Sequence, residues 1–143
     1  MSARSSITAR QMETWAHAQA IADELGIERS EDDRIRNIVV LGVNTFGWSF
    51  MVRGMEVPEG PPALHLTSPS GESWEYGNPE SDQVICGMAH EFAQVVTQTR
   101  NIADTRLVCE GDIAELWMRN AQCFAGAATE PPAPGVRRTK SSA

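Results

Sequence analysis

The sequence predicts an α+β protein, with two N-terminal helices followed by a small sheet that carries two further helices. Two observations lead to this class. Up to about residue 52 the apolar residues recur every three or four positions, as in amphipathic helices. After a proline-rich stretch at 56–63 they alternate with polar residues, as in strands. This stretch is also the best candidate for a domain boundary.

The first helix is predicted between residues 7 and 25. Its apolar residues, which include Met12, Trp15, Ile21 and Leu25, follow spacings of three to five. Gly26 is placed to end it, because glycine readily adopts the left-handed conformation that closes many helices.

The second helix is predicted from Ser30 to about Val52. Ser30 precedes three acidic residues, which are favoured in a first helical turn. Gly42 and Gly47 lie inside this segment. Because glycine disfavours a helix interior, the pair indicates close packing or a bend.

The second half of the chain predicts the sheet and its helices. A hairpin is expected because two alternating segments flank the sequence S-P-S-G, in which glycine supplies the turn. In order, the expected elements are strands at 64–66, 74–76 and 83–86, a helix at 88–100, a strand at 105–109 and a helix from 111 to 124.

Composition narrows the classes of partner. The net charge is -7 and the pI about 4.9, which disfavours nucleic acid and anionic membranes. No apolar run is long enough to span a bilayer. Cys86, Cys109 and Cys123 are far apart and odd in number, which favours reduced thiols in a cytoplasm over a disulfide framework.

The sequence M-E-T-W-A-H contains the candidate metal ligands. Glu13 and His17 are four positions apart, so they share a helix face and can both reach one divalent cation. An ordinary solvated polar pair explains the same spacing. A site also needs at least a third ligand, and His65 and His90 lie in the second half with no evident spacing to the pair.

Several separated runs carry a family resemblance that covers residues 9–126. These are D-R-I-R-N-I-V-V-L-G-V-N-T-F-G-W-S-F, L-T-S-P-S-G-E-S-W-E-Y-G and V-V-T-Q-T-R-N-I-A-D-T-R-L-V. They resemble actinobacterial metal-binding proteins related to mycothiol-dependent maleylpyruvate isomerase, in the DinB-like superfamily. The region from V-I-C-G-M-A-H-E-F to C-E-G-D-I-A-E-L-W is similar to the sterol-carrier-like domain that accompanies them.

The resemblance implies a division of the chain. Residues 1–26 would be the last helix of a four-helix metal-binding bundle, with Glu13 and His17 as ligands. Residues 27–60 would be a connecting helix and linker, and 61–126 the sterol-carrier-like domain. The composition of residues 127–143, rich in Pro, Ala, Ser and Arg, predicts a disordered tail. The other bundle helices and their histidine are missing, so we expect a truncated or divergent product, a homodimer, or a second chain that supplies them.

The resemblance also implies a function. It is that of an isomerase or transferase that uses mycothiol and a divalent metal, with zinc the expected ion, and we expect the isolated chain to be inactive. The alternative is a non-catalytic module that binds a small ligand or a protein. A weaker link, to wyosine base formation in transfer RNA, lacks the basic surface that RNA binding requires.

Overall fold

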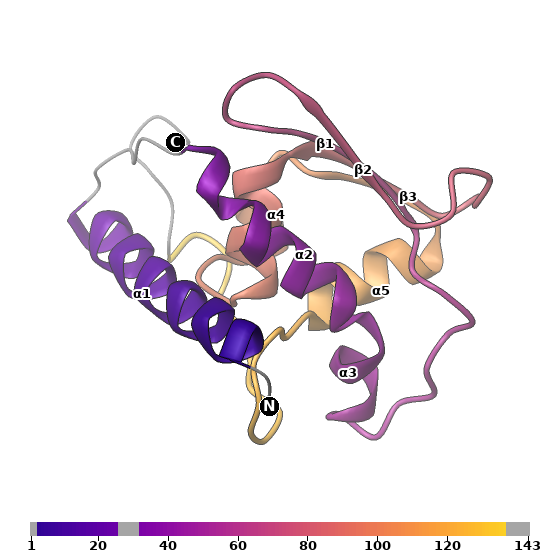
Figure 1. The fold of residues 1–143 in the computed structure, drawn as a ribbon. Helices are drawn as coiled ribbons and strands as arrows, with labels where there is room; N and C mark the ends of the chain where they lie inside the picture. Colours follow the sequence, from indigo (N-terminus) through magenta and orange to yellow (C-terminus); the bar gives the residue numbers. More distant parts are fainter. Residues whose placement is uncertain (1–2, 26–31, 137–143) are drawn as a thin grey trace.

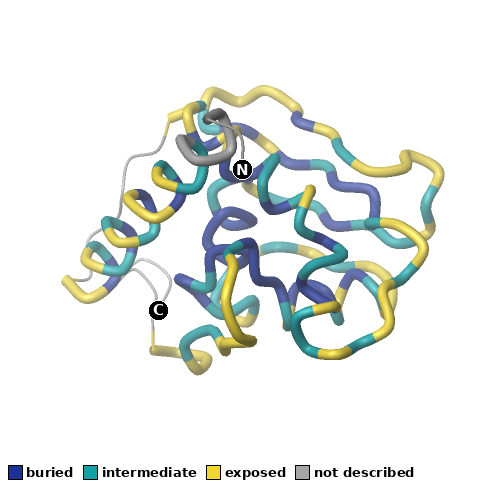
Figure 2. Tube along the Cα trace, turned by 60° about the horizontal axis from the view of Figure 1, so that its bottom comes forward, coloured by how far each residue is buried: buried dark blue, intermediate teal, exposed yellow. Residues whose placement is uncertain are grey.

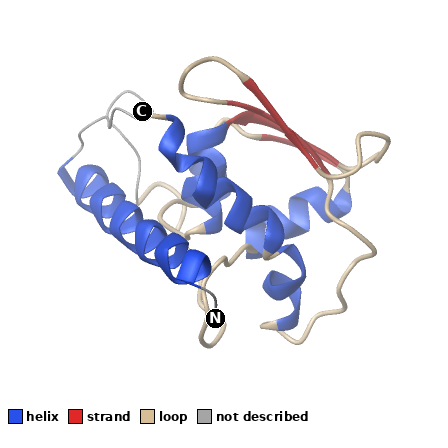
Figure 3. Ribbon diagram, in the orientation of Figure 1, coloured by secondary structure: helices blue, strands red, loops and turns tan. Residues whose placement is uncertain are grey.

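The elements of the fold follow the α+β order that the sequence predicts (Figures 1 and 3). The computed structural model describes residues 3–25 and 32–136. No described helix combines the length and apolar character that a membrane crossing requires. The elements are α1 (Ala3–Leu25), η1 (Asp33–Ile35), α2 (Arg36–Asn44), α3 (Phe46–Met51), β1 (Ala63–Thr67), β2 (Ser73–Tyr76), β3 (Val84–Met88), α4 (Ala89–Val96), η2 (Ile102–Asp104), β4 (Val108–Glu110) and α5 (Asp112–Asn120).

The four strands form one mixed sheet in the order β2-β1-β3-β4. β1 and β2 pair antiparallel, which confirms the predicted hairpin, and Gly71 supplies its turn with a φ of +93°. β3 lies parallel to β1, and β4 lies antiparallel to β3. The described helices lie on one side of this sheet, and no described element covers its other face, here called the open face (Figure 1).

One hydrophobic core joins the helices to the sheet. Trp117 of α5 lies at its centre. The centroid of its ring is 4.9 Å from that of Phe46 of α3 and 5.7 Å from that of Phe92 of α4, and both contacts are near-perpendicular and edge-on. The same core contains Met12 of α1 and Ile38 of α2. Buried positions accordingly line the inner sides of all these elements (Figure 2). The proline-rich stretch therefore joins segments that share one core.

The predicted second helix is broken into two. Thr45 leaves helical geometry, with φ -100° and ψ 16°, and its hydroxyl donates to the Leu41 carbonyl at 2.8 Å. The break falls between Gly42 and Gly47, the pair that indicated a bend. The predicted end of the first helix at Gly26 and the predicted start of the second at Ser30 lie outside the described residues.

The tail is ordered for longer than its composition predicts. Arg53 donates to Glu130 at 2.7 Å and also to the Thr129 carbonyl. The Thr129 hydroxyl donates to Gln98 at 2.6 Å, and Asp104 accepts from the Gly135 amide at 2.9 Å. The prediction of disorder is therefore wrong for residues 127–136, while 137–143 lie outside the described residues. The stabilising partners are polar groups of the folded body, which local composition does not reveal.

We expect Gly42→Ala and Gly47→Ala to change stability in opposite directions. A methyl group at Gly42 would lie 2.8 Å from a Cγ of Val96 and 3.0 Å from Phe92, so α2 and α4 would have to move apart. Such overpacking costs about 1–3 kcal/mol, and the better helix propensity of alanine recovers up to about 1 kcal/mol. At Gly47 the methyl group meets only Val57, at 3.6 Å, so the propensity gain remains. Urea unfolding measures both variants, and a more stable Gly42→Ala would contradict the close helix contact.

Candidate functional site

The inner face of α1 is partly apolar and partly polar. Met12 and Trp15 are buried in the core, as the sequence predicts. One and two turns further along, Gln19 and Asp23 are also buried, with 1% and 7% of their surfaces exposed. These four positions follow helical spacings of three and four, so they define a single inward face.

A buried ion pair fixes the C-terminal half of α1 against the body of the protein. Arg100, which follows α4, donates to an Asp23 carboxylate oxygen at 2.5 Å, and the two side chains are 5% and 0% exposed. Gln19 donates to the same oxygen at 2.8 Å. In the N-terminal half, the Gln11 side chain donates to the Arg34 carbonyl at 2.9 Å. α1 is thus held in both halves, which determines the face that it presents to solvent.

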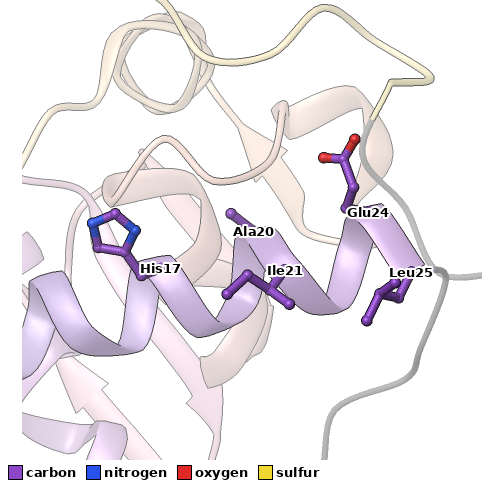
Figure 4. A pocket seen from close by; sticks show the side chains of 5 residues that line it. All are labelled: His17, Ala20, Ile21, Glu24 and Leu25. Carbon is purple, nitrogen blue, oxygen red and sulfur yellow. The ribbon is translucent and has the colours of Figure 1, made fainter.

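That solvent-facing side carries a row of four residues, the outer stripe: Glu13, His17, Ile21 and Leu25. Each is one helical turn from the next, and all four are exposed. Ile21 and Leu25 are each 61% exposed, which is high for large apolar side chains. His17, Ile21 and Leu25, together with Ala20 and Glu24, line a shallow hollow of about 240 Å³ (Figure 4).

The structure places Glu13 and His17 as the sequence predicts, on one exposed face of one helix. Across the described part of the chain, no three or more histidine, cysteine or acidic side chains are grouped so as to hold a metal ion. Further ligands for this pair would therefore have to come from outside the described residues. The role of Glu13 and His17 as metal ligands stays a prediction.

The other histidines lie apart from the outer stripe. His65 is on β1, and its Nδ1 is 3.1 Å from Glu75 of β2; its side chain is 42% exposed. His90 lies in the first turn of α4 and is partly exposed. The sheet and α1 lie on opposite sides of α2 and α4 (Figure 1).

Sequence reasoning missed which side of α1 faces outward at its C-terminal half. The apolar pattern assigned Ile21 and Leu25 to the packed face, whereas the structure buries Asp23 and exposes both of them. The partner of Asp23 is Arg100, 77 residues away, so the helix itself contains no signal for this outcome.

The fold and the outer stripe define an α+β protein with a carboxylate and an imidazole one turn apart on the exposed face of a helix. No family model matches the chain, and no solved structure does. The chain is similar to two uncharacterised proteins of Mycobacterium tuberculosis, one from strain CDC 1551 / Oshkosh and one from strain H37Rv. Each is 40% identical over 135 residues, which cover 94% of this chain and 51% of the relative. The chain thus spans about half the length of the curated relatives it matches.

Replacement of Arg100 by methionine should lower the free energy of unfolding by about 3–5 kcal/mol, because it leaves the Asp23 carboxylate buried without its cation. The double variant Asp23→Leu/Arg100→Met should recover part of this loss, since an apolar pair of similar volume removes both charges. Recovery is incomplete because the buried Gln19 amide loses its acceptor. Arg106→Met, at an exposed arginine, is the control and should change stability by less than about 0.5 kcal/mol. Urea unfolding decides: a double variant no more stable than Arg100→Met would contradict the role of the pair.

Proposed function

We propose that this chain contributes Glu13 and His17 to a divalent-metal centre of a thiol-dependent isomerase or transferase, and that a second packed element completes the centre. The observation that carries this proposal is the outer stripe. A carboxylate and an imidazole lie one turn apart on the exposed face of α1, directly followed by two exposed apolar residues.

Rigidity supports Glu13 and His17 as ligands. Metal centres depend on ligands that are held in place by their surroundings. α1 meets this need because the Asp23–Arg100 pair and the contact between Gln11 and Arg34 anchor its inner face. The side chains on its outer face therefore project from a fixed support.

The apolar end of the outer stripe supports a packed partner. Ile21 and Leu25 would be covered by a second helix that lies along α1, and such a helix would also pass beside His17 and Glu13. The M. tuberculosis relatives are about twice as long as the matched region, so they contain enough additional chain for such an element. A second copy of this chain is the other source of the missing ligands.

The proposed chemistry follows from the ligands. A bound divalent metal, with zinc the expected ion, supplies Lewis acidity that favours the thiolate of a small thiol cofactor, which the resemblance implies to be mycothiol. Glu13 and His17 hold and orient the ion, while the covered outer stripe keeps bulk water away from it. The reaction belongs in the cytoplasm, where the free thiols Cys86, Cys109 and Cys123 stay reduced.

A second candidate is a non-catalytic binding module. The high exposure of Ile21 and Leu25 favours it, because exposed apolar side chains beside a hollow suit a protein or small-ligand contact without any metal. This function would use the same surface but would be indifferent to the chemistry of Glu13 and His17.

Zinc titration of the full 143-residue chain separates the two functions. We expect weak zinc binding, because no third ligand is grouped with this pair among the described residues. Glu13→Gln and His17→Gln should each lower the affinity further, by at least about tenfold. Glu80→Gln and His90→Gln remove the same side chains elsewhere and should bind as the unmodified chain does. Calorimetry measures the affinities.

Equal zinc binding by all four variants would contradict the assignment of Glu13 and His17 as ligands. As a second readout, the full-length M. tuberculosis relatives should purify with a bound divalent metal. If they purify without any metal, the metal-centre function is rejected and the binding-module function remains.

The isolated chain should show no mycothiol-dependent isomerisation of maleylpyruvate, with or without added zinc, because two ligands do not fix the geometry of a catalytic ion. A coupled spectrophotometric assay with a complete isomerase as positive control measures this. Turnover by the chain alone that survives His17→Gln would show that the activity does not depend on the outer stripe.

A further inference from the structure

The open face of the sheet carries a row of three residues that can support thiol chemistry. His65 of β1 is paired with Glu75 of β2 on one side and with Cys86 of β3 on the other. Directly paired residues in adjacent strands project from the same face. The neighbouring positions Leu64 and Ile85 are buried in the core, so this row projects to the opposite face.

The contacts within the row orient the imidazole. His65 Nδ1 lies 3.1 Å from a Glu75 carboxylate oxygen. A carboxylate at this nitrogen favours the tautomer with a proton on Nδ1, which leaves Nε2 as the basic nitrogen. Cys86 occupies the adjacent position on the next strand, at the usual inter-strand spacing of about 4.8 Å. A carboxylate, an imidazole and a thiol thus follow one another across three strands.

We propose that Cys86 is a reactive thiol that exchanges with small disulfides, with His65 as its base and Glu75 as the residue that positions His65. In the exchange, the Cys86 sulfur attacks one sulfur of the disulfide and forms a mixed disulfide with it. The original sulfur–sulfur bond breaks, and the other half leaves as a thiolate. His65 takes the proton from Cys86 and returns it to the departing sulfur. No further oxidant is needed, because the disulfide is itself the oxidant.

The other two cysteines lack these features. Burial, followed by the nearby Glu115 and Cys86, raises the pKa of Cys109 to about 11. Burial raises the pKa of Cys123 to about 12. Because the thiolate is the nucleophile, both should react slowly at neutral pH. The structure thus distinguishes one cysteine from two internal references in the same chain.

The charge of the open face determines which disulfide is a suitable probe of Cys86. Glu75 belongs to the row, and Glu110 of β4, paired with Val84, is a second exposed carboxylate close to Cys86. Both repel anionic disulfides such as oxidised glutathione. A neutral dipyridyl disulfide avoids this repulsion, and its released thiopyridone reports the reaction by absorbance.

The experiment follows reaction of the full chain with the dipyridyl disulfide at pH 7. We expect one fast phase that maps to Cys86 by peptide mass spectrometry and disappears in Cys86→Ser. His65→Gln should slow it by about three- to tenfold, because loss of the base lowers the thiolate population more than it raises intrinsic nucleophilicity. Glu75→Gln should slow it less, in the same direction.

Glu110→Gln is the matched control, since it removes an exposed carboxylate from the same face without touching His65. It should not slow the fast phase or move its pH profile to higher pH, because loss of a carboxylate near a thiol does not disfavour the thiolate. His65→Gln should do both. Circular dichroism confirms that each variant is folded. A fast phase that maps to Cys109 or Cys123, or equal rates for His65→Gln and Glu110→Gln, would overturn the proposal.

Discussion

The indole of Trp117 is the point where the helices meet beneath the sheet. Phe46 and Phe92 contact it edge-on, so α3, α4 and α5 converge on one fully buried ring. A side chain of this size contributes several kcal/mol when it is buried among close-packed neighbours. Leu66 and Ile85 of the sheet belong to the same core. Because this core holds the described helices on one side, none of them covers the opposite face of the sheet.

The inward packing determines where chemistry can occur. α1 is fixed by a buried polar contact between Asp23 and Arg100, and the strands are fixed by buried apolar side chains such as Leu64. Each of these elements therefore has one buried face and one face that is exposed to solvent. The exposed face of α1 carries the outer stripe, and that of the sheet carries the row that contains His65 and Cys86. Both groups of side chains stand on regular elements, which hold functional groups more precisely than loops do.

Agreement between sequence and structure is best where a pattern is local. The alternation around S-P-S-G is sufficient for the hairpin, because turn and register are determined by adjacent residues. Gly42 marked a close helix contact because only its missing side chain lets Val96 approach so closely. The glycine pair indicated a bend, but the apolar pattern does not locate it at Thr45, where a side-chain hydroxyl competes for a helix carbonyl. The order of residues 127–136 depends on Arg53 and other distant donors, so composition alone gave the wrong result.

The sequence by itself determined the α+β class, the approximate position of most elements and the presence of Glu13 and His17 on one helix face. These follow from periodicity and spacing, which act over a few residues. Only the tertiary structure decided that Asp23 faces inward while Ile21 faces solvent, and that His65 stands between an acid and a thiol. The physical reason is that a polar group can be buried only where a partner meets it. Such partners come from remote parts of the chain and meet only when the fold is complete.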